Sequence, residues 1–106
     1  MSEPLIFLAA QARLAEIWEY TVEKWDEEQA EFYLRELGAA IREIPDRRQV
    51  WRSIKARRLP KIYFVRSGHH FIFFREVDGG IAVISILHEN MNMLQRVRED
   101  DGITNH

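Results

Sequence analysis

Basic side chains, two histidines and one tyrosine in the second half of the chain are the residues that could cleave a phosphodiester bond. Cleavage of RNA needs a group that orients the 2′-hydroxyl, cations that stabilise charge on the phosphate, and an acid for the leaving oxygen. The candidates that could converge at one end of a sheet are Lys55, Arg58, Lys61, Tyr63, His70, Arg75 and His88. Against this chemistry, residues 89–106 contain no tyrosine and only two bases, and the chain carries a net charge of −2.

Other catalytic or metal-binding patterns are missing from the sequence. It contains no Ser/His/Asp set with a supporting motif, no glycine-rich phosphate loop and no zinc-ligand spacing. The absence of cysteine excludes disulfides and cysteine-based zinc sites, and fits a reducing compartment. We therefore expect a protein without cofactor or metal that acts through contacts with other proteins.

Charge is strongly segregated along the chain. Residues 1–46 carry eleven acids and four bases, residues 47–75 carry nine bases and no acid, and residues 76–106 carry six acids and two bases. The basic segment could face an acidic protein, the chain's own acidic helices or nucleic acid. Because a protein built to grip nucleic acid is usually basic overall, we favour an acidic protein partner.

A β-hairpin from Gly68 to His88 is predicted at the centre of a small sheet. Both arms are rich in β-branched and aromatic residues, and Asp78-Gly79-Gly80 supplies a turn. Strict alternation would place one apolar set on each face of the hairpin: Ile72, Phe74, Ala82, Ile84 and Ile86 on one, and Phe71, Phe73, Ile81, Val83 and Leu87 on the other. We expect two helices to cover one face and a partner to cover the other.

Two antiparallel helices are predicted in the first half of the chain. After a short strand at 5–8, apolar residues from Leu14 to Trp25 recur with helical spacing, which places Trp18 and Trp25 on the core face. Asp26 is expected to cap the second helix, with Gln29 three residues on, and Pro45 ends it. The connection is so short that the helices must form a hairpin.

The remaining elements complete an α+β domain that spans residues 1–106. We predict a loop with one helical turn over 46–56, a strand over 59–65, a short helix within 90–98 and a frayed acidic tail over 99–106. The expected fold is an N-terminal strand and an antiparallel helical hairpin on a mostly antiparallel four-stranded sheet, with a short C-terminal helix. The apolar run at 5–10 is too short to span a membrane and lacks a basic flank, which predicts a cytoplasmic protein.

In this order of elements, the sequence resembles a ParE-type toxin of the ParE/RelE superfamily of bacterial toxin–antitoxin modules. The resemblance spans nearly the whole chain and rests on residues 12–21 with Trp25, 29–31 with Tyr33 and Leu34, 68–75, and 83–88 with Met91. The sequence departs from the family at Phe7-Leu8, where a helix cap is missing, and at Phe74, which replaces a frequent tyrosine. The loss of that hydroxyl favours a binding surface over a catalytic one.

The resemblance implies a toxin that poisons DNA gyrase, through its A subunit, and is neutralised by a ParD-like antitoxin laid over its sheet and helical hairpin. Two alternatives stay open: a RelE-like endonuclease that cuts messenger RNA on the ribosome, and a non-toxic relative that still binds an antitoxin. Nine residues are the candidates for contact with antitoxin or target: Trp51, Arg57, Arg58, Lys61, Tyr63, His70, Arg75, His88 and Met91. Trp51 could equally be packed beside the core.

Overall fold

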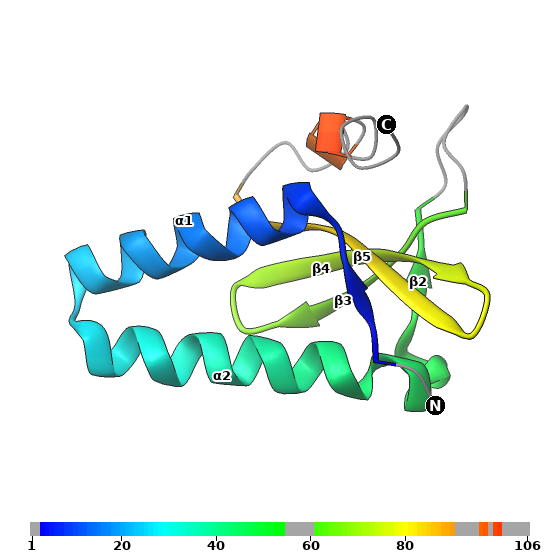
Figure 1. The fold of residues 1–106 in the computed structure, drawn as a ribbon, viewed down its shortest axis with the longest axis horizontal. Coiled ribbons are helices and arrows are strands. Elements are labelled where there is room, and N and C mark those ends of the chain that lie inside the picture. Colours follow the sequence, from blue (N-terminus) through cyan, green and yellow to red (C-terminus); the bar gives the residue numbers. More distant parts are fainter. Residues whose placement is uncertain (1–2, 55–60, 91–95, 98, 101–106) are drawn as a thin grey trace.

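The computed structural model describes residues 3–54, 61–90, 96–97 and 99–100 as one helical hairpin packed against one sheet (Figure 1). Two α-helices, α1 (Leu8–Lys24) and α2 (Glu27–Glu43), follow the short strand β1 (Leu5–Ile6). Two 3₁₀ turns, η1 (Ile44–Asp46) and η2 (Arg48–Val50), lead to β2 (Arg52–Ser53), β3 (Tyr63–Ser67), β4 (His70–Val77) and β5 (Gly80–His88). The predicted α+β class and helical hairpin are confirmed.

The sheet has five strands in the order β1-β5-β4-β3-β2, one more than predicted. Strand β1 runs parallel to β5, and the other neighbours are antiparallel. The additional strand β2 pairs Arg52 with Phe64 and Ser53 with Tyr63, in a segment that we predicted to be a loop. Two residues are too few to show strand periodicity, so the sequence gives no signal for β2.

The helix boundaries follow from their caps. Asp26 Oδ1 accepts a hydrogen bond of 2.7 Å from the backbone N–H of Gln29, as predicted. Helix α1 begins at Leu8 without a capping side chain, because Phe7 occupies the cap position. Gln11 Nε2 instead donates to the carbonyl of Ile6 at 2.8 Å, which ties the first turn to β1. None of the described helices is both long and apolar enough to cross a membrane.

A β-bulge decides which side chains of β5 face the helices. Phe73 lies opposite Ser85 whereas the next residue, Phe74, lies opposite Val83, so Ile84 is an extra residue in β5. The bulge reverses the alternation between Ile81 and Ile84, so strict alternation was wrong for this part of β5: Ile81 and Val83 face the helices, and Ile84 faces away. The helix-facing core comprises Ala10, Ile17, Leu37, Ile41, Ile44, Ile72, Phe74, Ile81, Val83 and Ile86.

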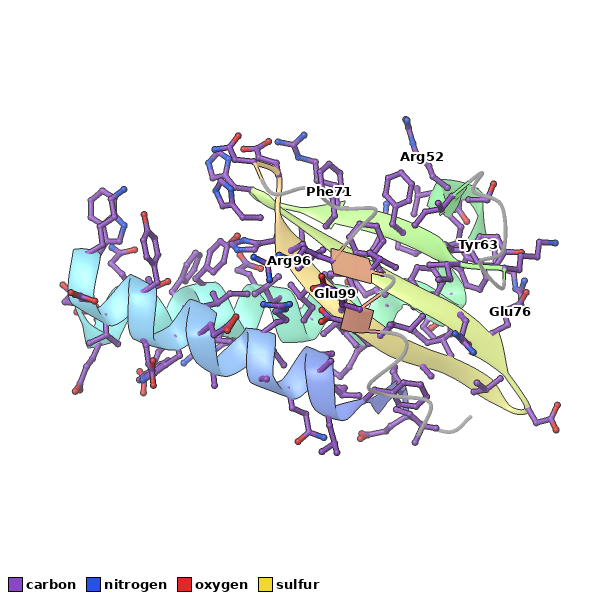
Figure 2. All side chains as sticks on the ribbon, turned by 90° about the horizontal axis from the view of Figure 1, so that it is seen from above. Arg52, Tyr63, Phe71, Glu76, Arg96 and Glu99 are labelled. Atoms are coloured by element: carbon purple, nitrogen blue, oxygen red, sulfur yellow. The ribbon has the colours of Figure 1, made fainter. Side chains whose placement is uncertain are left out.

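The other face of the sheet is covered in part by the chain's own C-terminal residues. Val97 is fully buried in a second apolar cluster with Ile62, Phe73, Ile84 and Leu87. Residues 96–97 and 99–100 lie over the sheet in Figure 2. We had expected a partner to cover this face, but the chain's own residues already cover part of it. The predicted C-terminal helix falls largely on residues 91–95 and 98, outside the described residues.

Two residues that we had placed by periodicity or by their position near the end of the chain lie elsewhere. Trp25 was predicted in the core but is 67% exposed, because the last turn of α1 projects beyond the sheet. Asp100 was predicted in a frayed tail but is only 2% exposed, because Arg13 and Ser85 hydrogen-bond its carboxylate. Helical spacing shows which face of a helix is apolar and not how far the sheet extends beneath it.

Candidate partner-binding groove

A groove of about 900 Å³ lies between the ends of the two helices and the end of the sheet where β3 turns into β4. Helices α1 and α2 form one wall, and the turn at His69 together with the end of β5 forms the other. Six large hydrophobic side chains are exposed in the described part of the chain, and three of them line this groove: Tyr20, Trp25 and Phe32, at 60%, 67% and 58%. Exposed aromatic side chains gathered at one site indicate a surface for a protein partner.

Three histidines form the sheet side of the groove. His70 lies directly opposite His88 on the neighbouring strand, with ring centroids 5.2 Å apart, and the ring of His69 stacks 6.2 Å from that of His88. His69 Nδ1 donates to Glu89 at 2.7 Å, and Arg66 donates to the same carboxylate at 2.6 Å. The hydrogen bond from His69 and the charge of Arg66 lower the pKa of Glu89. This side of the groove, the histidine rim (His69, His70 and His88), is thus polar, and the charges of the adjacent Glu89 and Arg66 largely cancel each other.

Tyr33 connects α2 to this rim. Its hydroxyl hydrogen-bonds His70 Nδ1 at 2.5 Å, and burial raises the pKa of the phenol. Burial, followed by the nearby His88 and His69, lowers the pKa of His70 to about 4. His70 is therefore neutral near pH 7, and it serves here as a hydrogen-bonding residue that holds the helical hairpin against the turn.

Gly68 permits this close approach, and its replacement by alanine is expected to destabilise the fold by about 1–2 kcal/mol. Its φ is +59°, and an added Cβ would lie 3.1 Å from the Tyr33 hydroxyl. Urea unfolding measures the loss. The matched control is Gly68→Ala in a Tyr33→Phe background, where the contact with the hydroxyl is gone and the alanine should cost less. Equal costs in the two backgrounds would contradict a role of the hydroxyl contact and leave the positive φ and the ring carbon at 3.3 Å as the cause.

The shifted pKa of His70 predicts a loss of stability in mild acid. The folded chain keeps His70 neutral to about pH 4, whereas the unfolded chain protonates it near the ordinary value of 6.5. The contribution of neutral His70 to the free energy of unfolding is therefore complete above pH 6.5. It falls as the pH decreases from 6.5 to about 4, and it remains lost at lower pH. Because His70 is only half-buried, we expect a loss of about 1–2 kcal/mol, less than the full shift would give.

Urea unfolding at pH 7.5 and pH 4.5 measures this loss. The His70→Asn variant keeps a hydrogen-bonding side chain that does not titrate, so its stability should differ less between the two pH values. The same pH dependence in the variant and the parent chain would assign the acid sensitivity to other groups.

The predicted site residues are divided between the two ends of the sheet. His70 and His88 lie at the groove, whereas Arg75 and Tyr63 lie toward the opposite end, with Lys61 over the ring of Tyr63. Figure 2 shows Tyr63 near Glu76 at that end, away from Phe71. The candidates for phosphodiester cleavage that the structure describes therefore do not converge. Arg57, Arg58 and Met91, like Lys55, lie outside the described residues.

Trp51 packs at the end of the sheet that is remote from the groove. Its ring meets Phe74 edge-on at 4.8 Å, and its Nε1 donates to the carbonyl of Ile44 at 2.8 Å. Arg48 stacks on the outer side of the ring at 4.5 Å and is ion-paired with Glu76. The side chain is therefore a half-buried part of the core, one of the two roles that we predicted for it.

Within the described ranges, no group of three or more histidine or acidic side chains could hold a metal ion. The structure also shows functional candidates that the sequence did not single out, namely the three exposed aromatics and the Tyr33–His70 pair. Phe32 offered one signal, since it lies beside the apolar face of α2 rather than on it. No local pattern predicted that Tyr33 would meet His70, because 37 positions separate them.

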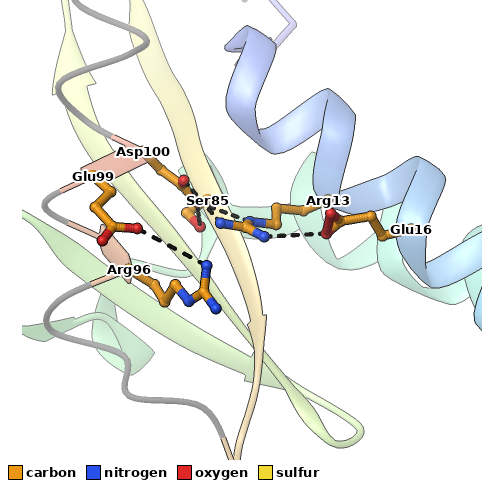
Figure 3. Close-up of polar contacts among 6 residues, drawn as sticks. All are labelled: Arg13, Glu16, Ser85, Arg96, Glu99 and Asp100. Carbon is orange, nitrogen blue, oxygen red and sulfur yellow. Dashed lines mark hydrogen bonds and ion pairs between the residues drawn. The ribbon is translucent and has the colours of Figure 1, made fainter.

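A largely buried ion pair joins Arg13 of α1 to Asp100 (Figure 3). Arg13 of α1 contacts Asp100 with two nitrogens, each at 3.0 Å, and Ser85 Oγ donates to the same carboxylate at 2.5 Å. The hydrogen bond to Asp100 raises the pKa of Arg13, so the guanidinium is charged at any pH at which the protein folds.

Most of the sequence is similar to proteins of one family. Residues 8–93 match the model of the family described as "ParE toxin of type II toxin-antitoxin system, parDE". The protein named Toxin ParE1 of Mycobacterium tuberculosis is 38% identical over 93 residues, in both strain CDC 1551 and strain H37Rv, which covers 87% of this chain and 94% of the relative. Toxin ParE1 of Caulobacter vibrioides strain CB 15 is 38% identical over 88 residues, 78% of this chain and 84% of the relative. This chain belongs to the ParE toxin family of type II toxin–antitoxin systems.

Proposed function

We propose that this toxin inhibits DNA gyrase by protein–protein contact and is neutralised by a cognate antitoxin that covers the groove. The family match over residues 8–93 is the observation that carries the proposal. The proposed site of action is the cytoplasm, where gyrase and chromosomal DNA are found. The toxin contributes a binding surface to this action and no reacting group.

The distribution of polar residues supports a non-enzymatic mode of action. A ribonuclease would need its acid, its base and its phosphate-binding cations within reach of one phosphate. The described candidates instead lie at opposite ends of β4, with His70 at its start and Arg75 near its end. Phe74, which is fully buried beneath Trp51, provides no hydroxyl at the position where a tyrosine is frequent.

The groove has the features of a seat for the antitoxin. Tyr20, Trp25 and Phe32 offer apolar surface that a folded chain normally buries, and the histidine rim offers hydrogen-bonding groups beside it. An amphipathic segment that orders on binding could pack its apolar face on Tyr20, Trp25 and Phe32, which form the aromatic wall of the groove. Burial of this apolar surface would contribute favourable free energy to the association of toxin and antitoxin.

Expression of the chain alone and together with the antitoxin gene next to it tests the toxin–antitoxin assignment. We expect growth arrest from the toxin alone and normal growth when both are expressed. Normal growth from a soluble, folded toxin alone would indicate a non-toxic relative. Cleavage of messenger RNA that requires ribosomes, with gyrase activity unaffected, would replace the proposed target with the ribosome.

A further inference from the structure

The carboxylate of Asp100 fixes the orientation of Arg13. Arg13 Nε and Nη2 donate to the two oxygens of Asp100, each at 3.0 Å, which is the bidentate arrangement that holds a guanidinium in one plane (Figure 3). Ser85 holds the carboxylate from β5, and the side chain of Asp100 is only 3% exposed. The orientation of Arg13 is therefore fixed by contacts that join α1, β5 and Asp100.

The remaining nitrogen of this guanidinium is hydrogen-bonded to a more exposed carboxylate. Arg13 Nη1 donates to Glu16 at 3.1 Å, and both Arg13 and Glu16 line the groove. The side chain of Glu16 is 62% exposed, and an exposed pair one helical turn apart contributes little stability. Glu16 can consequently leave Arg13 at small cost, whereas Asp100 cannot.

We infer that Arg13 is an anion-binding residue of the groove, positioned by Asp100 and Ser85, and that an acidic side chain of the antitoxin takes the place of Glu16 on it. This inference rests on the proposed function, since it names the chemistry of the antitoxin at the same groove. The partner segment would carry a carboxylate beside the apolar side chains that pack on Tyr20, Trp25 and Phe32. A cation that is already held in place loses little freedom on binding, which favours affinity.

Three variants separate this role from a purely structural one. The pair Arg13→Gln with Asp100→Asn removes both charges together, so that neither is left buried without a partner. Asp100→Asn alone keeps the cation but weakens its support. Glu16→Gln is the matched control, since it removes the exposed carboxylate from the same guanidinium. Urea unfolding verifies that each variant is folded at the temperature of the binding measurement.

The measurement is the affinity of each folded variant for the purified antitoxin encoded next to this gene, at several salt concentrations. We expect the neutral pair to bind about tenfold or more weakly, with a smaller dependence on salt, because a charge pair has been removed. Asp100→Asn should weaken binding because Arg13 is no longer held in one orientation, but its salt dependence should not fall, since the cation is kept. Glu16→Gln should bind at least as tightly as the parent chain.

Affinity and salt dependence of the neutral pair that match those of the parent chain would overturn the inference, because Arg13 would then be structural only. Weaker binding by Glu16→Gln would also overturn it, since Glu16 would then be a contact rather than a placeholder. Failure of the parent chain itself to bind the antitoxin would overturn the proposed function and this inference with it.

Discussion

Replacement of Trp25 and Phe32 by alanine is expected to weaken antitoxin binding by a factor of 100 or more while leaving the toxin folded. Both side chains are mostly exposed, at 67% and 58%, so their loss should cost the isolated domain no more than about 0.5 kcal/mol. Aromatic anchors at the centre of an interface typically contribute about 2 kcal/mol or more each. Isothermal titration with the purified antitoxin measures the change, and co-expression shows whether growth is still rescued.

The matched control for this prediction replaces exposed apolar residues outside the groove. Leu8 and Val50 are 71% and 41% exposed and do not line the groove, so Leu8→Ala with Val50→Ala should leave the affinity within about threefold of the parent value. Loss of affinity in the control equal to that in the Trp25 and Phe32 pair would show that the antitoxin does not select the groove.

Replacement of Asp100 by alanine is expected to cost about 3–5 kcal/mol, because it leaves the largely buried guanidinium of Arg13 with the exposed Glu16 as its remaining partner among the described residues. This is a large part of the total stability of about 5–15 kcal/mol that a domain of this size has. The side chain of Arg13 is only 16% exposed, so water can replace the lost carboxylate only in part. Urea unfolding at pH 7.5 measures the loss.

Two controls show whether this loss comes from the charge of Arg13 that Asp100 no longer balances. Arg13→Met with Asp100→Leu removes both charges and should cost less than Asp100→Ala alone. Glu16→Ala removes the exposed partner of the same guanidinium and should cost no more than about 0.5 kcal/mol. A small effect of Asp100→Ala, similar to that of Glu16→Ala, would mean that the C-terminal residues contribute little to the fold.

The local features of the fold were predictable from the sequence because they depend on residues close together in the chain. Asp26 and Gln29 are three positions apart, and the turn at Gly79 lies between two arms of similar composition. The order of the elements was read from these local patterns, and it supported the family resemblance. Features of this kind are encoded within one or two helical turns or one hairpin.

The features that were missed depend on long-range geometry. Nothing near Asp100 in the chain indicates that it would meet Arg13, which is 87 positions away. The bulge at Ile84 lies in a strand that is apolar on both faces apart from Ser85, so an extra residue leaves no mark in the pattern. Trp25 continues the apolar stripe of α1 past the point where the sheet ends.

The candidate site was predicted only in part, because its membership depends on the register of the sheet. His70 and His88 were singled out at the ends of strands, and pairing across the hairpin brings them to the groove. Lys61, Tyr63 and Arg75 were grouped with them because the register of the sheet was unknown, and register is what places them at the opposite end. The aromatic wall follows from how far the helices project, which composition does not reveal.

The supercoiling activity of purified DNA gyrase, measured with increasing amounts of the purified toxin, tests the central claim most directly. We expect inhibition of supercoiling or accumulation of cleaved DNA, and recovery when the antitoxin is added in equal amount. Full supercoiling in the presence of a large excess of folded toxin that arrests growth in cells would contradict gyrase as the target.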